Sequence, residues 1–104
     1  EPTVMSEVTL SAYHRQLLLD SMESVVSTSA TLKYMLNGVP VSVGGKTGTA
    51  QVGTTKSENA LFTAVAPADN PEVAAVCVIE QGHSGSSSAY TVCKVFKVYF
   101  TKED

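Results

Sequence analysis

The sequence contains no apolar run near the roughly 20 residues that a membrane-spanning helix requires. It also has no cluster of basic residues, since 7 lysines and arginines are outnumbered by 10 acidic residues and the net charge is -3. A nucleic acid is therefore not expected as a partner. Charged residues make up 16% of the chain and hydrophobic residues 43%, which is a globular rather than a disordered composition. With 104 residues, the chain forms one domain or less.

Cysteine and histidine are also scarce, with two of each. Cys77 lies in an apolar run and Cys93 in a helical pattern, so both are interpreted as small buried hydrophobic residues. A disulfide between them stays an open alternative, because the sequence does not give their separation. Neither His14 nor His83 has a second histidine or a carboxylate at the spacing of metal ligands. We expect no metal and no cofactor.

Apolar residues recur at helical spacing near the N-terminus: Leu10, Tyr13, Leu17, Leu18, Met22, Val25 and Val26. This pattern predicts a helix over residues 11–26, with Ser11 or Thr9 as its cap. Residues 27–29 are expected to interrupt it. A short helical turn should follow over residues 31–36, ended by the glycine at position 38.

Three strands are predicted over residues 41–52, 60–66 and 73–81. The last two are apolar enough to be central strands that are covered on both faces. The segment that joins them, 67–71, is rich in proline, aspartate and asparagine, which favour turns. The second and third strands should therefore form an antiparallel hairpin.

The segment over residues 86–100 would suit a strand or a helix. Lys94 and Lys97 are three residues apart, so they share one face of a helix but would lie on opposite faces of a strand. Ala89, Cys93, Phe96 and Phe100 then form the opposite, core-facing stripe, and a helix is predicted. The expected fold class is α+β: an antiparallel sheet of about three strands, with an N-terminal and a C-terminal helix packed against it.

The segment from Gly44 to Gln51 combines one lysine with two threonines and three glycines. A lysine beside small residues on an exposed strand offers three donors to an anionic ligand. The glycines let such a ligand approach the backbone. Gly45-Lys46-Thr47 also matches the end of a phosphate-binding P-loop, but that motif needs glycine where Pro40 stands and a helix afterwards. The segment predicts a substrate-binding edge and not a complete catalytic site.

This run resembles the Lys-Thr-Gly box of the penicillin-binding proteins, the serine D,D-transpeptidases that cross-link peptidoglycan: Lys46-Thr47-Gly48-Thr49-Ala50-Gln51. Residues 22–26, 66–72 and 82–99 resemble the preceding helix, the next hairpin and the closing helix of the class B (high-molecular-weight) branch. The resemblance implies that residues 1–104 are the C-terminal portion of a transpeptidase domain. The fold would be a fragment of the penicillin-binding and serine β-lactamase-like fold. One departure is Leu61-Phe62, where relatives often carry a Trp-Phe pair.

The family's nucleophile motif, Ser-x-x-Lys, is absent, because no serine has a lysine three residues later. Ser57-Glu58-Asn59 spells the family's Ser-x-Asn motif, but it follows the Lys-Thr-Gly box where the family's copy precedes it, so we interpret it as structural. The chain begins at Glu1 without a methionine. We expect a piece of a longer protein, inert by itself, that leaves apolar surface uncovered because its neighbouring strands and helical subdomain are missing. The parent's membrane anchor and export signal would lie upstream and place this portion at the extracytoplasmic face of a bacterial membrane.

The resemblance implies that Lys46, Thr47, Gly48 and Thr49 bind the substrate. That substrate would be a peptidoglycan stem peptide ending in D-Ala-D-Ala, or a β-lactam that mimics it. Lys46 would supply positive charge and hydrogen-bond to the Ser-x-Asn serine. The hydroxyls of Thr49 and Thr47 would bind the terminal carboxylate, and the Thr49 backbone N–H would be an oxyanion-hole donor. The remainder of the transpeptidase domain is the expected protein partner, with no membrane contact by this segment.

Two alternatives stay open. The parent could be a β-lactam-sensing receptor domain of the same fold, which is acylated without turning over. It could also be a serine β-lactamase, which shares the Lys-Thr-Gly box but usually lacks the Ala50-Gln51 continuation and this hairpin. That continuation and the helix at residues 22–26 favour the transpeptidase.

Overall fold

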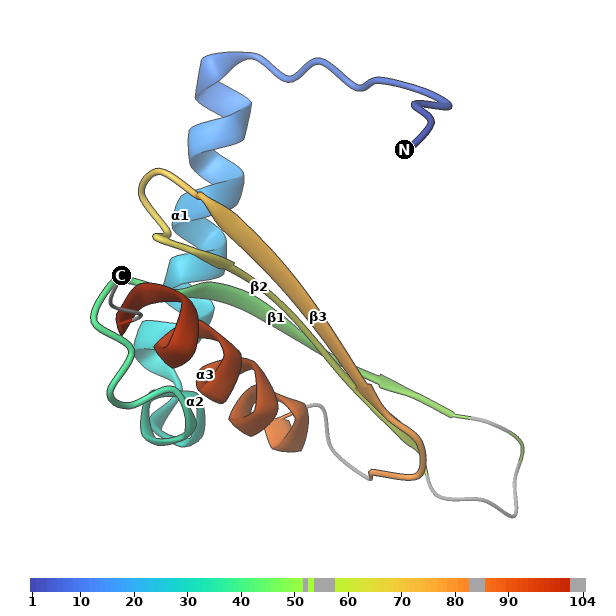
Figure 1. Ribbon diagram of the computed structural model, residues 1–104, viewed down its shortest axis with the longest axis vertical. Helices are drawn as coiled ribbons and strands as arrows, with labels where there is room; N and C mark the ends of the chain where they lie inside the picture. The colour runs from blue at the N-terminus through green and yellow to red at the C-terminus, as the bar shows by residue number, and fades with distance from the viewer. Residues whose placement is uncertain (52, 54–57, 83–85, 102–104) are drawn as a thin grey trace.

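The computed structural model describes residues 1–51, 53, 58–82 and 86–101. Two helices are followed by three strands and a final helix (Figure 1). The elements are α1 (Ala12–Thr28), α2 (Ala30–Met35), β1 (Gly44–Ala50), β2 (Asn59–Ala66), β3 (Val73–Ile79) and α3 (Ser86–Thr101). This is the expected α+β arrangement.

The three strands form one antiparallel sheet in the order β1-β2-β3. In the first ladder Gly44 lies opposite Val65, and in the second Ala66 lies opposite Val73. The predicted hairpin of β2 and β3 is confirmed. Among the described residues, β2 is the central strand, and β1 and β3 each have one unpaired edge.

The hydrophobic core lies between α3 and one face of the sheet, where Phe62 of β2 and Phe96 of α3 are fully buried. Burying a side chain of this size contributes about 1.5–3 kcal/mol. The other core-facing positions of β2 are the small residues Ala60, Ala64 and Ala66, which let α3 lie close to the sheet. The other buried members of the cluster are Val26, Leu32, Leu36, Val43, Ala64, Ala66, Ala89, Val92 and Cys93.

Serine caps begin the first two helices. The Ser11 side chain accepts a hydrogen bond from the His14 backbone N–H at 3.1 Å, and Ser29 accepts one from Leu32 at 3.2 Å. Each bond satisfies a donor that the first turn of a helix leaves unpaired. Of the two predicted caps, Ser11 is therefore the one used. The interruption between the helices falls at Ser29 alone, since α1 continues through the other residues expected to break it.

Strand β1 is shorter than the predicted strand over 41–52, because residues 41–43 precede it. The Ala68 N–H donates to both the carbonyl oxygen and the Oγ of Ser42, at 3.0 and 2.9 Å. The segment just before β1 is thus hydrogen-bonded to the β2–β3 turn and not to a neighbouring strand. Position 52 lies outside the described residues.

Within the described residues, the predicted coverage on both faces is not found at β3, where one apolar face is open, as expected of a fragment that leaves apolar surface uncovered. Side chains of β3 alternate between half-buried and exposed, and Val76 and Val78 are 66% and 53% exposed. The core-facing neighbour of these valines, Cys77, is half-buried. Helix α3 packs against one face of β3, and no described element covers the other face there.

Helix α3 confirms the choice of a helix over a strand for the last segment. Ala89, Cys93 and Phe96 are buried, whereas Lys94 and Lys97 are exposed. Both cysteines are free. The Cys93 thiol lies 3.7 Å from the Asn37 carbonyl oxygen, to which it donates a weak hydrogen bond.

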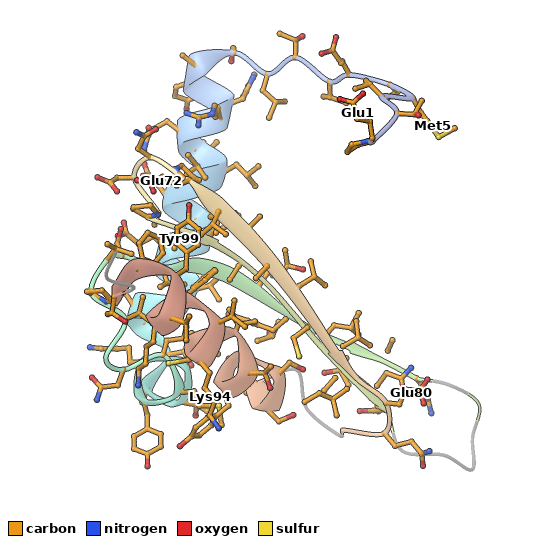
Figure 2. The ribbon with its side chains drawn as sticks, in the orientation of Figure 1. Glu1, Met5, Glu72, Glu80, Lys94 and Tyr99 are labelled. Carbon is orange, nitrogen blue, oxygen red and sulfur yellow. The ribbon has the colours of Figure 1, made fainter. Side chains whose placement is uncertain are left out.

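Residues 1–11 precede α1 and are exposed. Figure 2 shows Glu1 and Met5 in this segment, away from the sheet and α3. Within the described parts of the chain, no helix has the length and apolar character needed to cross a membrane.

Candidate functional site

The Lys-Thr-Gly segment forms most of β1, which lies at an edge of the sheet. Strand β1 pairs with β2 along one side only. Its outer edge is therefore a row of backbone N–H and C=O groups without a strand partner among the described residues. A ligand in an extended conformation can bind to such an edge through the backbone.

The side chains of the predicted site alternate between the two faces of β1. Thr47 lies opposite Phe62 in the ladder, so Thr47 is on the face that bears the core, and Thr49 shares that face. Lys46 and Gly48 are on the other face. The outer edge of β1 is the one region that all four residues adjoin.

Lys46 lies at a pocket between α1 and β1. The pocket has a volume of about 370 Å³ and is lined by Leu18, Ser21, Met22, Val25, Gly45 and Lys46. The lysine is exposed, and its Nζ donates to the Thr47 carbonyl oxygen at 2.6 Å. Lys46 therefore brings a cation to the rim of an otherwise largely apolar pocket.

The α1 wall of this pocket is a feature that the sequence interpretation missed. Leu18, Met22 and Val25 were assigned to the apolar stripe of a helix, which is their local pattern. Their spacing of four and three residues puts them on one face of α1, and this face packs on β1 near Lys46. Strand β1 lies further along the chain, beyond α2. Only the packing of α1 against β1 in the folded structure shows that the apolar stripe borders the site.

The two glycines that precede Lys46 serve packing. A Cβ at Gly44 would lie 3.1 Å from the Cβ of Met22, and one at Gly45 would lie 2.5 Å from the Cζ of Phe62. These positions approach α1 on one face and the core on the other. At Gly48 a Cβ would meet the Leu61 Cβ at 3.6 Å, an ordinary contact. A side chain could therefore be added without a clash at Gly48 but not at Gly44 or Gly45.

Asn59, the last residue of the out-of-order Ser-x-Asn sequence, takes part in a turn. Its Oδ1 accepts a hydrogen bond from the Gln81 backbone N–H at 3.0 Å. Gln81 has a φ of 54°, and the bond connects the start of β2 to the turn that follows β3. Ser57 lies outside the described residues.

The histidines give no sign of a metal site in the described residues. His14 Nδ1 lies 2.9 Å from the Ser11 Oγ at the start of α1. His83 lies outside the described residues. In the described ranges, no group of three or more histidine, cysteine, aspartate and glutamate side chains is placed to hold a metal ion.

Several solved structures are similar to this fold. The D,D-transpeptidase domain of a peptidoglycan glycosyltransferase from Eggerthella lenta has 27% sequence identity and a TM-score of 0.62, over 81% of this chain and 19% of that one. Penicillin-binding protein 2B from Streptococcus pneumoniae strain R6 has 24% identity and a TM-score of 0.70, over 100% and 18%. Penicillin-binding protein A from M. tuberculosis, solved as an imipenem acyl-enzyme complex, has 24% identity and a TM-score of 0.55, over 74% and 18%. This chain thus spans about a fifth of the length of the structures it matches.

The comparison with curated proteins finds no match. The family model described as "Penicillin binding protein transpeptidase domain" matches residues 1–97. That match includes β1 and all but the last four residues of α3, and the solved structures share the same fold. The chain belongs to the penicillin-binding protein transpeptidase domain family.

Proposed function

We propose that this chain supplies the substrate-binding strand of a serine-type D,D-transpeptidase. In this proposal residues 1–104 are the C-terminal portion of the transpeptidase domain, and another part of the same domain carries the nucleophilic serine and its lysine base. The substrate is a peptidoglycan stem peptide that ends in D-Ala-D-Ala. The domain would work at the extracytoplasmic face of the cell membrane.

The observation that carries the proposal is the position of Lys46. Its ammonium group lies on an edge strand, at the rim of a pocket, and among the described residues no carboxylate is within ion-pair distance of it. A cation in this position attracts an anion at the strand edge. The carboxylate at the end of a stem peptide, or that of a β-lactam, has the matching charge.

The threonines complete the proposed binding of the carboxylate. Thr49 is exposed and Thr47 is partly exposed, so both hydroxyls can be reached from the outer edge of β1. Backbone groups two residues apart in a strand point to the same edge. The Thr49 N–H would then share the edge of the Thr47 carbonyl and act as one oxyanion-hole donor. Such a donor typically contributes about a hundredfold to a thousandfold in rate.

Exposed apolar surface supports the view that the rest of the domain packs on this chain. Val76 and Val78 on β3, Tyr13 on α1 and Val98 on α3 are all more than half exposed. Surfaces of this kind usually mark a contact with another protein part. One such surface, on β3, lies on the same side of the sheet as Lys46, so a covering layer would close the site from that side.

The proposal includes β-lactams as ligands of the complete domain. The M. tuberculosis relative was solved as an acyl-enzyme with imipenem. An acyl-enzyme requires a nucleophile, and no serine of this chain has a lysine three residues later. In the complete domain, β1 would orient the β-lactam while a serine from another segment is acylated.

The proposal is tested in the full-length protein with Lys46→Ala and a labelled penicillin. Loss of a charge-assisted hydrogen bond should slow acylation by about tenfold or more. Lys33→Ala is the matched control, because Lys33 is an exposed lysine on α2 and its loss changes the net charge equally. Near-native acylation of Lys46→Ala, with a native circular dichroism spectrum, would remove Lys46 from the site.

A second test uses the 104-residue chain by itself. Incubation with a labelled penicillin and a denaturing gel should show no covalent adduct, because the nucleophile lies in another segment. A stoichiometric labelled band would mean that a serine of this chain is acylated. The division of the site between two segments would then be wrong.

A further inference from the structure

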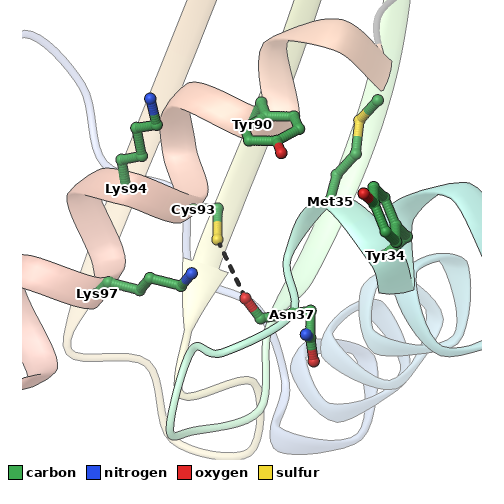
Figure 3. Close-up of a pocket in the computed structure, with 7 residues that line it drawn as sticks. All are labelled: Tyr34, Met35, Asn37, Tyr90, Cys93, Lys94 and Lys97. Atoms are coloured by element: carbon green, nitrogen blue, oxygen red, sulfur yellow. Dashed lines mark hydrogen bonds between the residues drawn. The ribbon is translucent and has the colours of Figure 1, made fainter.

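A second pocket lies between α2 and α3. Its volume is about 210 Å³, and the lining residues are Tyr34, Met35, Asn37, Tyr90, Cys93, Lys94 and Lys97. We call it the α2–α3 pocket. Figure 3 shows the α3 residues on one wall and Tyr34, Met35 and Asn37 on the other. It shares no lining residue with the pocket at Lys46.

The α2–α3 pocket is positively charged. Lys94 and Lys97 contribute two ammonium groups, and no acidic residue is among the lining residues. Lysines three apart on a helix are neighbours on its surface, where two like charges repel each other. In the described part of the chain, neither lysine has a carboxylate within ion-pair distance. An anion bound in the pocket would lower the repulsion between these two positive charges.

Contacts with the pocket walls orient both lysines. The Nζ of Lys94 lies 6.0 Å from the centre of the Tyr90 ring, a cation–π distance. The side chain of Lys97 bends toward the α2–β1 connection, where a Cβ at Gly38 would lie 2.9 Å from the Lys97 Nζ. Gly38 has a φ of 96°, so this close approach occurs at a position that already favours glycine. The exposed side chain of Lys97 thus reaches from α3 toward the opposite wall of the pocket.

Two tyrosines give the pocket an amphipathic rim. Tyr34 and Tyr90 are 73% and 49% exposed and come from opposite walls. Each offers a ring face to an apolar group and a hydroxyl to a polar one. The volume corresponds to roughly seven water molecules at about 30 Å³ each. That space fits one phosphate with a short organic substituent.

We propose that the α2–α3 pocket binds a small phosphate monoester. Lys94 and Lys97 hold the phosphate, for which lysine is a common ligand as a point charge. The organic part contacts the rings of Tyr34 and Tyr90. The site is separate from the transpeptidase strand and does not depend on the function proposed for that strand.

The test is a titration of the full-length protein with phenyl phosphate, followed by the nuclear magnetic resonance signals of labelled residues in α2 and α3. We expect saturable shifts confined to the lining residues, and weaker binding as salt is added. Inorganic phosphate and phenol, which each carry half of the probe's chemistry, should bind more weakly than phenyl phosphate. Linear, unsaturable shifts would overturn the proposal.

The charged half of the site is tested with Lys94→Gln and Lys97→Gln. Each should weaken phenyl phosphate binding by about tenfold. Lys33→Gln removes the same charge from α2 outside the pocket and should change binding less than about twofold. Both target lysines are exposed, so folding should be preserved, as circular dichroism can verify. Equal losses in all three variants would show only a general charge effect and would overturn the assignment.

Discussion

A Cβ atom at position 45 would lie 2.5 Å from the Cζ of Phe62 and 2.9 Å from its Cε1. Phe62 is fully buried, so its ring cannot move aside without disturbing the core. The residue next to Lys46 is therefore in direct contact with the core. Phe62 thus packs against the backbone beside Lys46, on the face of β1 opposite the lysine side chain.

Gly45→Ala should destabilise the chain by about 1–3 kcal/mol, because the added methyl group overpacks a core without free space. Urea unfolding followed by circular dichroism measures the loss. Gly48→Ala is the control in the same strand, since its Cβ would make only an ordinary contact with Leu61. If both variants lose equal stability, the contact with Phe62 is not the cause.

Thr49→Ala separates the two roles proposed for Thr49, because it removes the hydroxyl and keeps the backbone N–H. In the full-length protein the apparent affinity for penicillin should fall about tenfold, while the acylation rate at saturation should change little. Stopped-flow acylation at several penicillin concentrations gives both quantities. Thr31→Ala, an exposed threonine of α2 away from β1, is the control. A fall confined to the saturating rate would instead assign the hydroxyl to the transition state.

Asn59→Ala should act on stability and not on the reaction. It removes the hydrogen bond to the Gln81 N–H, with an expected loss of about 0.5–1.5 kcal/mol. Penicillin acylation of the full-length protein should stay within about twofold of the native rate. Slower acylation at unchanged stability would mean that Ser57-Glu58-Asn59 works as the family motif despite its order.

Ser88→Ala should stabilise the chain by about 1 kcal/mol, because the Ser88 Oγ is fully buried and has no hydrogen-bond partner among the described residues. Thermal unfolding measures the gain. Alanine also favours helices, so Ser21→Ala on α1 serves as the control for propensity. Its exposed Oγ donates to the Leu17 carbonyl oxygen at 2.8 Å, and its loss should be nearly neutral. A loss of stability in Ser88→Ala would indicate a partner for this hydroxyl.

Local patterns predicted most of the fold. The Ser11 cap, the helical stripe of α1, the β2–β3 hairpin and the helix at the C-terminus depend on residues that are close in the sequence. The start of β1 could not be predicted, because it depends on Ser42 and Ala68, which are 26 positions apart. Uncovered apolar surface was expected of a fragment, but its place on β3 could not be predicted, because an apolar run looks the same with one covered face or two.

The sequence predicted which residues of β1 form the site, but not which other elements surround them. The run from Lys46 to Thr49 was correctly placed on a strand, and the period of two residues accounts for the alternation of its side chains. The sequence could not show that α1 forms a wall beside Lys46. It also could not show that Gly45 is required by Phe62, since these two residues belong to different strands. The roles of Lys46, Thr47, Gly48 and Thr49 in substrate binding remain predictions.

Lys46 also has a consequence for how β1 aligns with β2. If β1 slipped by one residue, the lysine would turn toward Phe62 and the interior. An ammonium ion buried there without a counter-charge would cost several kcal/mol. The same cation that is proposed to attract a ligand therefore disfavours an alignment of β1 that is shifted by one residue. An apolar residue at position 46 would remove this energetic penalty.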